Sequence, residues 1–271
     1  MPQKLPIAIV IPHAGLDIPP ELMGRIALTE AQIFNEADVY TDLIYDFHDR
    51  VEQCHIFPVA RSIIDVNRPN TAHPKLRPGD GIVKRMTSYG ADVYREGQEP
   101  DAALEQALID TYWRPWHATM AAIAADDSIK LVLDCHSMAA LGPARFENAA
   151  QIRPRVSASN LGDTEGNPVA ADAHISAPPE LTRHIGQQFG DALATIPDLA
   201  PTSAPFAINT PYSGGPNIWM HGGKAQPWLM IELSRATYIG EQTGDSPVKP
   251  PDMTRIEQIR DNLWQAIAAI I

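Results

Sequence analysis

The chain has 271 residues and a formal net charge of −12 at pH 7, with 44% hydrophobic and 20% charged residues. Such a composition can bury a large core, and the acidic balance without a Lys/Arg cluster argues against nucleic-acid binding. The apolar run at 6–12 is too short for a secretory signal, and no apolar stretch reaches the roughly 18 residues that span a membrane. Cys54 and Cys135 form no disulfide framework and are interpreted as reduced thiols. We therefore expect a cytoplasmic protein without membrane or nucleic-acid partners.

Strand and helix patterns alternate along the chain. Short, branched apolar runs predict strands, and apolar residues at helical spacing predict helices. The predicted elements are a strand at 6–11, a helix at 30–53, a strand at 54–59, a helix at 100–126, a strand at 130–133, a helix at 178–196, strands at 204–212 and 228–233, and a helix at 253–271. This order predicts an α/β fold of three layers, with a central mixed sheet between helices and one domain over residues 1–271.

Two long segments fall outside these elements. Residues 69–100 are rich in Pro, Gly and charge, and residues 140–174 are irregular and rich in Gly, Asn and Pro. Loops of this length tend to be functional lids or disordered segments, and we expect both to wall a site. Asp101 is the predicted N-cap of the longest helix, and residues 134–138 are expected to form a loop after a strand.

Three polar motifs each follow a predicted strand. They contain His13, His136 and Glu232. Each alone is more simply interpreted as an ordinary loop or strand cap, but the carboxyl ends of the strands are where α/β sheets place their sites. Two histidines and a carboxylate suit zinc with one open position for water. A further carboxylate can act as general base on that water.

The carboxylate ligand is less obvious from the residues. Asp17 lies four residues after His13, while Glu36, Asp38 and Asp42 form an acidic cluster in the predicted helix. In a helix, Asp38 and Asp42 share one face. A solvated acidic face is an equally simple interpretation of this cluster, so the choice stays open here.

The segment 61–69 places two arginines, an aspartate and an asparagine after a strand. A guanidinium binds a carboxylate through two parallel hydrogen bonds, and an asparagine adds a neutral donor. The alternative is a set of surface ion pairs of little energetic worth. We favour a functional role because apolar and polar residues alternate, which directs several of these groups to one face. A second polar loop, Gly214 to His221, precedes the last strand, and its Gly-Gly pair predicts a turn.

Taken together, these motifs resemble the N-formylglutamate amidohydrolase family. The resemblance rests on the set and its order, which span most of the chain. The matching pieces are PHAG at 12–15, DVYTDLIYDF at 38–47, RSIIDVNRP at 61–69, YREGQEP at 94–100, YWRPWH at 112–117, DCHSM at 134–138, NLGDTEGNP at 160–168, SGGPNIWMHGG at 213–223 and IELSRATY at 231–238. The family resemblance implies a fold similar to zinc carboxypeptidases and aspartoacylases.

The resemblance also implies a metal site. His13 and His136 are similar to the zinc histidines of the family, and Asp38 is similar to its carboxylate ligand. Glu232 resembles the general base. The implied cofactor is Zn²⁺, although a His/carboxylate site accepts several divalent metals.

Substrate-binding roles follow from the same resemblance. Asn67 and Arg68 resemble the pair that holds a substrate carboxylate. Arg61 and Asp65 resemble the residues that polarise the scissile carbonyl and position that pair.

The second polar loop carries one departure from the family. His221 is a candidate substrate contact, but the residue before it is Met220, where family members acting on N-formylglutamate tend to have arginine. A methionine cannot bind a side-chain carboxylate. This puts specificity for glutamate in question and leaves the hydrolytic chemistry unaffected.

The sequence thus predicts a zinc-dependent amidohydrolase that releases formate, or another acyl group, from a small N-acyl amino acid. A deacylase or peptidase of the same fold is the first alternative, but a chain this short leaves little room for a peptide cleft. A non-catalytic relative is the second, and the intact His13, His136 and Glu232 argue against it. A structural zinc site would need four closing Cys/His ligands. The oligomeric state stays undetermined.

Overall fold

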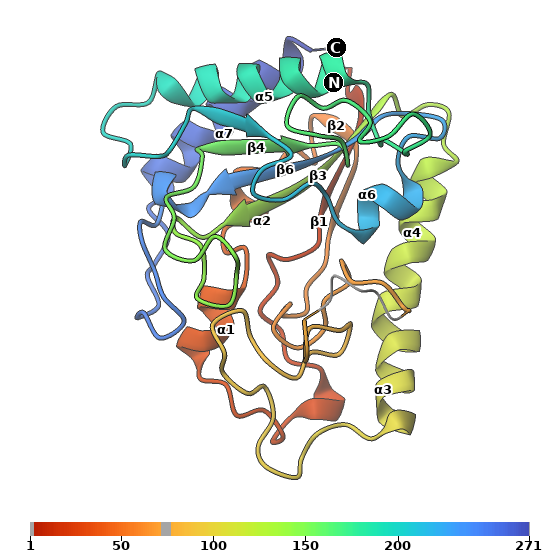
Figure 1. Cartoon of the computed structure of the whole chain (residues 1–271), viewed down its shortest axis with the longest axis vertical. Helices are drawn as coiled ribbons and strands as arrows, with labels where there is room; N and C mark the ends of the chain where they lie inside the picture. Colours follow the sequence, from red (N-terminus) through yellow and green to blue (C-terminus); the bar gives the residue numbers. More distant parts are fainter. Residues whose placement is uncertain (1–2, 72–76, 271) are drawn as a thin grey trace.

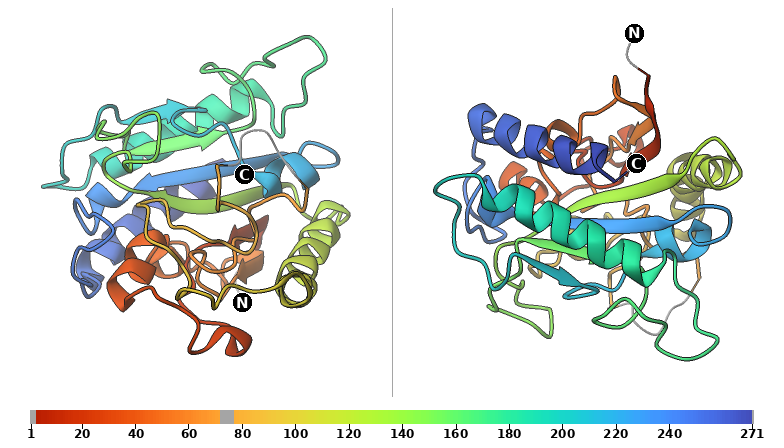
Figure 2. Two further views of the ribbon diagram at one scale, coloured as in Figure 1. Left: turned by 60° about the horizontal axis from the view of Figure 1, so that its bottom comes forward. Right: turned by 90° about the horizontal axis from the view of Figure 1, so that it is seen from above.

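The computed structural model describes residues 3–71 and 77–270, which form a six-stranded mixed sheet with helices on both faces (Figure 1, Figure 2). The strands are β1 (Leu5–Ile11), β2 (Val51–Ile56), β3 (Leu131–Met138), β4 (Val156–Ser159), β5 (Phe206–Ile208) and β6 (Trp228–Ser234). Their spatial order is β2-β1-β3-β6-β4-β5. Strands β2, β1, β3 and β6 are parallel to one another, β4 is antiparallel to β6, and β5 is parallel to β4.

Helices cover both faces of the sheet. They are α1 (Glu30–Glu36), α2 (Thr41–Ile44), α3 (Ala102–Leu108), α4 (Arg114–Ala124), α5 (Pro179–Ala194), α6 (Pro216–His221) and α7 (Met253–Ala268), with a π-helical turn η2 (Ile109–Trp113) and 3-10 turns η1 (Pro20–Leu22) and η3 (Arg235–Thr237). Helices α5 and α7 pack together on one face of the sheet, and α4 and α6 pack together on the other (Figure 1, Figure 2). The predicted α/β fold with a mixed sheet between helices is confirmed.

Strand β1 shows how the sequence builds both layers. Its residues Ile7, Ile9 and Ile11 belong to the core cluster shared with α5 and α7, whereas Ala8 and Val10 belong to the cluster shared with α4. Successive side chains of a strand point to opposite faces, so a continuous apolar run is what a strand covered on both faces requires.

None of the helices in the described ranges combines the length and apolar character needed to cross a bilayer.

The predicted helix at 30–53 is wrong. Only α1 and the single turn α2 are helical, and β2 already begins at Val51, three residues before the predicted strand at 54–59. Between the two helices the backbone N–H of Asp38 donates to the carbonyl of His13 at 3.0 Å, and Tyr40 adopts a left-handed conformation with φ of 66°. This contact diverts the chain to the end of β1, so tertiary structure overrides the helical spacing.

Strands and helices also extend where loops are expected. Residues 134–138 continue β3 to Met138, and β4 and α6 fall in segments predicted to be irregular. The reason is that polar residues in these segments are buried around a site, which hides their periodicity. The predicted strand at 204–212 shortens to β5, and the helix at 100–126 is a helical run from α3 through η2 to α4.

The predicted helix ends and loops fare better. The Asp101 carboxylate accepts a hydrogen bond from the backbone N–H of Leu104 at 2.9 Å, which confirms the N-cap. No strand or helix forms in the described part of 69–100, of which 72–76 lie outside the described residues. Helix α7 matches the last predicted element, whose final residue 271 is also outside the described chain.

Candidate metal centre and active site

Two histidines and an aspartate converge at the carboxyl edge of the sheet. The Nδ1 atoms of His13 and His136 lie 3.1 Å apart, and Oδ2 of Asp38 lies 3.4 Å from the first and 3.1 Å from the second. All three side chains are about 2% exposed. Among the described residues, this is the cluster whose ligand atoms stand close enough to hold a metal ion.

The spacing of these atoms fits a divalent cation. A tetrahedral zinc ion with bonds of about 2.0–2.1 Å keeps its ligand atoms about 3.3 Å apart, close to the separations of 3.1 and 3.4 Å measured here. Two imidazole nitrogens and one carboxylate oxygen are also the donors that zinc accepts. The residues present therefore fit the metal that the family resemblance implies.

Sheet register places His136 beside Glu232. The two residues occupy paired positions of the parallel strands β3 and β6. Their neighbours Leu133 and Cys135 point into the core under α5 and α7, so the alternation of the strand directs Asp134 and His136 to the opposite face. His13 follows the end of β1, the strand that pairs with β3.

Each histidine is oriented by a carboxylate on its second ring nitrogen. His13 Nε2 lies 2.8 Å from Oδ1 of Asp65, and His136 Nε2 lies 3.2 Å from Oδ1 of Asp134. Metal-binding histidines commonly have such a partner, which sets the tautomer and the ring orientation. With the outer nitrogens facing carboxylates, both Nδ1 atoms point toward each other and toward Asp38, where a cation would contact them.

Asp134 is itself held from helices on the same face. Its Oδ1 accepts a hydrogen bond from Nδ2 of Asn217 at 3.1 Å, and Oδ1 of Asn217 accepts one from the indole N–H of Trp116, also at 3.1 Å. Asn217 lies on α6 and Trp116 on α4. The orientation of His136 therefore depends on a chain of buried polar groups that reaches the outer helix layer.

Electrostatics keep the aspartates ionised. Burial alone would raise the pKa of Asp38, but hydrogen bonds with both histidines and the charge of Arg61 hold it well below its usual range. Burial also opposes ionisation of Asp65, where the charges of Arg68, His13 and Arg61 again lower the pKa. A carboxylate that stays charged is available to a cation over a wide pH range.

Arg61 bridges the two aspartates. Its Nη1 lies 3.4 Å from Oδ1 of Asp38 and its Nη2 lies 3.1 Å from Oδ2 of Asp65. The side chain is 17% exposed and lines the cavity next to His13, Asp38 and His136.

The predicted pair Asn67 and Arg68 stands at the same cavity. The backbone N–H of Asn67 donates to Oδ1 of Asp65 at 3.0 Å, and Nη1 of Arg68 lies 3.4 Å from the other carboxylate oxygen. The side-chain oxygen of Asn67 accepts from the backbone N–H of Asn217 at 3.0 Å, which leaves its amide nitrogen to a ligand. Asp65 is fully buried and is not among the cavity-lining residues, so its contacts position the pair from behind.

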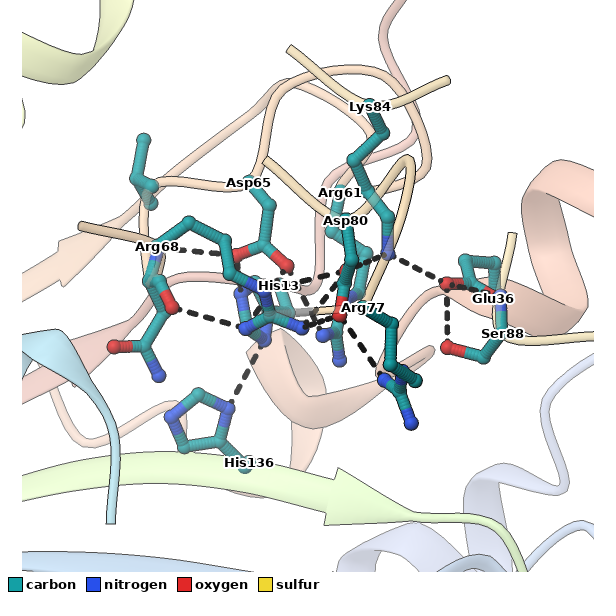
Figure 3. Close-up of polar contacts among 12 residues, drawn as sticks. His13, Glu36, Arg61, Asp65, Arg68, Arg77, Asp80, Lys84, Ser88 and His136 are labelled. Atoms are coloured by element: carbon teal, nitrogen blue, oxygen red, sulfur yellow. Dashed lines mark hydrogen bonds and ion pairs between the residues drawn. The ribbon is translucent and has the colours of Figure 1, made fainter. Parts of the chain in front are cut away.

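A charged network extends from this pair into the loop 69–100 (Figure 3). Arg68 Nη2 lies 3.2 Å from Asp80, and the amino group of Lys84 lies 3.1 Å from Asp80 and 3.0 Å from Glu36. Lys84 is only 1% exposed. Buried charges are tolerated when they are paired and hydrogen-bonded, and this pairing ties the long loop to the site.

Glu232 carries a carboxylate oxygen without a partner. The residue is 7% exposed, and its Oε2 is buried with no hydrogen bond among the described residues. Burial raises its pKa to about 7, with the charge of His136 acting against the shift and that of Asp38 adding to it. A buried glutamate with a pKa near neutrality can both take up and release a proton under working conditions.

These groups open into a cavity of about 1090 Å³. As predicted, both long loops contribute to its wall, with Asp80 and Tyr89 from one and Phe146 and Arg153 from the other. The cavity is large enough for a small ligand.

The remaining predicted residues lie elsewhere. Asp17 is exposed and pairs through its backbone beside Pro58, and Asp42 lies on α2 away from the histidines. Glu36 lines the cavity, but Lys84 and Ser88 engage its carboxylate. Of the four acids left open, Asp38 is therefore the one that meets the histidines.

The structure does not bring His221 into the cavity. Its Nε2 lies 2.9 Å from Nδ1 of His117, whose Nε2 lies 2.9 Å from the carbonyl of Val66. The ring stacks between His117 and Trp228, so it is part of the packing behind the site. His221 is the last residue of helix α6, which forms in a segment predicted to be a polar loop, and the helix turns the ring inward.

Sequence reasoning missed several residues that the site uses. Asp134, Asn217 and Trp116 orient His136, and Arg153 lines the cavity. The first three lie in motifs already noted, at 112–117, 134–138 and 213–223, but their directions depend on packing. Arg153 lies in an irregular segment with no periodic signal.

The chain belongs to the N-formylglutamate amidohydrolase family, whose sequence model matches residues 5–239. An N-formylglutamate deformylase of Pseudomonas putida is 24% identical over 247 residues, which cover 88% of this chain and 83% of the relative. The resemblance inferred from the motifs is confirmed.

Two solved structures share the fold. The N-formylglutamate amidohydrolase of Ralstonia eutropha JMP134 superposes with a TM-score of 0.74 at 18% identity, covering 99% of this chain and 95% of that one. Gene product Atu2144 of Agrobacterium tumefaciens superposes with a TM-score of 0.54 at 14% identity, covering 97% and 91%.

Proposed function

We propose that the protein is a zinc-dependent amidohydrolase that converts a small N-formyl amino acid and water into formate and the free amino acid. The observation that carries this proposal is the convergence of His13, Asp38 and His136 beside the unpaired carboxylate of Glu232. The family of the chain and its deformylase relative support the choice of substrate.

His13, Asp38 and His136 are the residues that would hold the cation. When bound, it would supply Lewis-acid chemistry, which acidifies water and polarises a carbonyl. Asp65 and Asp134 keep both histidines in the tautomer that leaves Nδ1 unprotonated.

Glu232 is the proposed general base and acid. Its Oε2 is free to accept the proton of the attacking water, and its pKa of about 7 allows it to return that proton to the leaving amine nitrogen. The C–N bond of the amide breaks in the second step, so one proton is carried from water to the amine with no net change in Glu232.

Arg61, Asn67 and Arg68 are the proposed substrate contacts. The guanidinium of Arg61 adds positive charge where the carbonyl oxygen becomes negative. Asn67 and Arg68 bind the α-carboxylate, which orients the N-acyl group toward the proposed metal site. Asp65 acts through these residues and His13 by positioning them.

The test combines metal content of the purified protein with formate release from a panel of N-formyl amino acids, each with and without a chelator. The expected result is about one zinc ion per chain, as a site with three protein ligands and one open position holds, together with chelator-sensitive formate release. Bound metal without formate release would refute the deformylase activity. Full activity in the metal-free protein would refute the role of the three ligands.

A further inference from the structure

The described residues that line the cavity include six arginines, although the whole chain is acidic. They are Arg61, Arg68, Arg77, Arg145, Arg153 and Arg235. The first three form ion pairs with buried aspartates, and Arg145 and Arg235 donate to backbone carbonyl oxygens. Arg153 has neither kind of partner in the described ranges.

The charge of Arg153 acts on Glu232, but its guanidinium has few direct polar partners. The residue is 2% exposed, its Nε is buried without a hydrogen bond, and its Nη2 makes a long contact of 3.4 Å with the amide oxygen of Asn148. The guanidinium lies against the rings of Tyr212 and Phe146, at 5.0 and 5.6 Å from their centroids. Burying a charge with so few direct hydrogen-bond partners is costly, so a ligand anion bound to the guanidinium would reduce that cost.

The backbone holds Arg153 in place. Its N–H donates to the carbonyl of Ala140 at 3.1 Å, and its own carbonyl accepts from the N–H of Ser203 at 3.0 Å. Strand β4 begins three residues later and pairs with β6, the strand of Glu232. The guanidinium is therefore presented from a fixed frame next to the reacting groups.

The apolar residue before His221 supplies no charge to the cavity. Met220 lies on α6 and packs against the core cluster of α4, and it is not among the cavity-lining residues. Positive charge for a second substrate carboxylate therefore has to come from another segment.

We propose that Arg153 binds the side-chain carboxylate of the substrate and thereby makes the enzyme selective for acidic N-formyl amino acids. This inference rests on the proposed function. Asn67 and Arg68 bind the α-carboxylate, and Arg153 binds the second carboxylate through the paired N–H groups of its guanidinium. A neutral side chain such as an amide gives the guanidinium of Arg153 no anionic partner, which lowers the affinity of the cavity for such a substrate.

Binding is the better readout because Arg153 also acts on the proposed base, whose pKa burial raises and the arginine charge lowers. The parent protein for the test is the Glu232→Gln variant, which stays bound to uncleaved substrate. Titration calorimetry measures its affinity for N-formyl-glutamate and for N-formyl-glutamine. The expected preference for glutamate is about 10- to 100-fold, the range for hydrogen bonds to a charged group.

Arg153→Gln in this parent should reduce that preference to within about threefold, while Arg153→Lys should retain part of it because the charge remains. Arg145→Gln is the matched control, since it removes a cavity arginine that is engaged with backbone carbonyls, and it should keep the preference. Circular dichroism and thermal unfolding show that each variant is folded.

The proposal is overturned if the parent binds both compounds equally or not at all, or if Arg153→Gln keeps the full preference. Formate release by the wild-type enzyme tests the proposed function separately. A preference that depends on Arg153 in a protein that releases no formate would confirm the carboxylate site and refute the deformylase activity. Formate release by the wild-type enzyme, combined with a glutamate preference that does not depend on Arg153, would support the deformylase activity and refute the carboxylate site.

Discussion

The paired histidines behind the site make stability depend on pH in a calculable way. The carbonyl of Val66 can only accept a hydrogen bond, so His117 must carry its proton on Nε2. Its Nδ1 is then an acceptor, and His221 must donate from Nε2. Burial lowers the pKa of His221 to about 4, with the charges of His117 and Lys224 acting in the same direction. The pair is thus held neutral in the folded protein.

The sign of the effect follows from proton binding. Between pH 6.5, the ordinary pKa, and pH 4 the unfolded chain binds a proton at His221 that the folded chain does not. Stability therefore falls as the pH drops through this window and levels off below it. Linkage with these two pKa values gives a loss of at most about 2 kcal/mol between pH 7 and pH 5.

The assay is urea unfolding of the wild-type protein and of His221→Gln, each at pH 7 and pH 5 with chelator present to exclude metal binding. Groups without contact to this pair contribute equally to both proteins, so the difference between the two losses reports on His221 and its partner His117. The wild type should lose up to about 2 kcal/mol more than the variant. Losses that agree within about 0.3 kcal/mol would refute the assignment of a neutral buried pair.

Three further predictions concern the site. Asp65→Asn replaces the carboxylate that faces His13 Nε2 with a neutral amide and should weaken zinc affinity by roughly 10- to 100-fold, measured by competition with a metal-binding dye. Asp80→Asn, which alters the same network without touching His13, should leave the affinity unchanged, and equal effects of the two variants would contradict the orienting role of Asp65. Glu232→Gln should keep its metal and lose roughly 10²- to 10⁴-fold in kcat. Glu147→Gln, at the exposed part of the cavity, should retain turnover. A wild-type rate in Glu232→Gln would show that Glu232 is not the general base. Because Glu232 accepts a proton only when it is deprotonated, kcat/KM should fall as the pH decreases, with the midpoint of the fall above pH 4.5 and no higher than about pH 7. A bound metal ion lowers the pKa of Glu232 and moves this midpoint downward. A profile that stays flat down to pH 5 would contradict the role of Glu232.

The sequence was sufficient to predict which strand ends carry the site. His13, His136 and Glu232 follow or end apolar runs, and parallel strands bring such positions to one edge. The choice among the acids was not predictable, because it depends on one backbone hydrogen bond from Asp38 to His13 that no periodicity encodes. The helical spacing even pointed to a shared face with Asp42 that does not exist.

The side-chain directions of Arg153 and His221 could not be predicted from the sequence either. Both are polar residues in segments whose sequence predicts irregular structure, and short-range patterns treat them alike. Packing turned His221 toward His117 and Trp228 and left Arg153 facing the cavity. Side-chain direction in irregular segments is set by long-range contacts, so it requires the fold.

The proposed metal ligands are held in place by contacts that need no metal. His13 and His136 are 123 residues apart in sequence, and each is held by its own carboxylate. The order of assembly follows from this separation, since the long chain segments between the ligands must be folded before the three atoms can meet. We therefore expect a cation to bind late in folding, in contrast to zinc modules that are unfolded without their ion. A protein stripped by chelation should keep its cooperative unfolding and regain its metal on dialysis, so that metal supply would set the active fraction of this enzyme without changing its abundance.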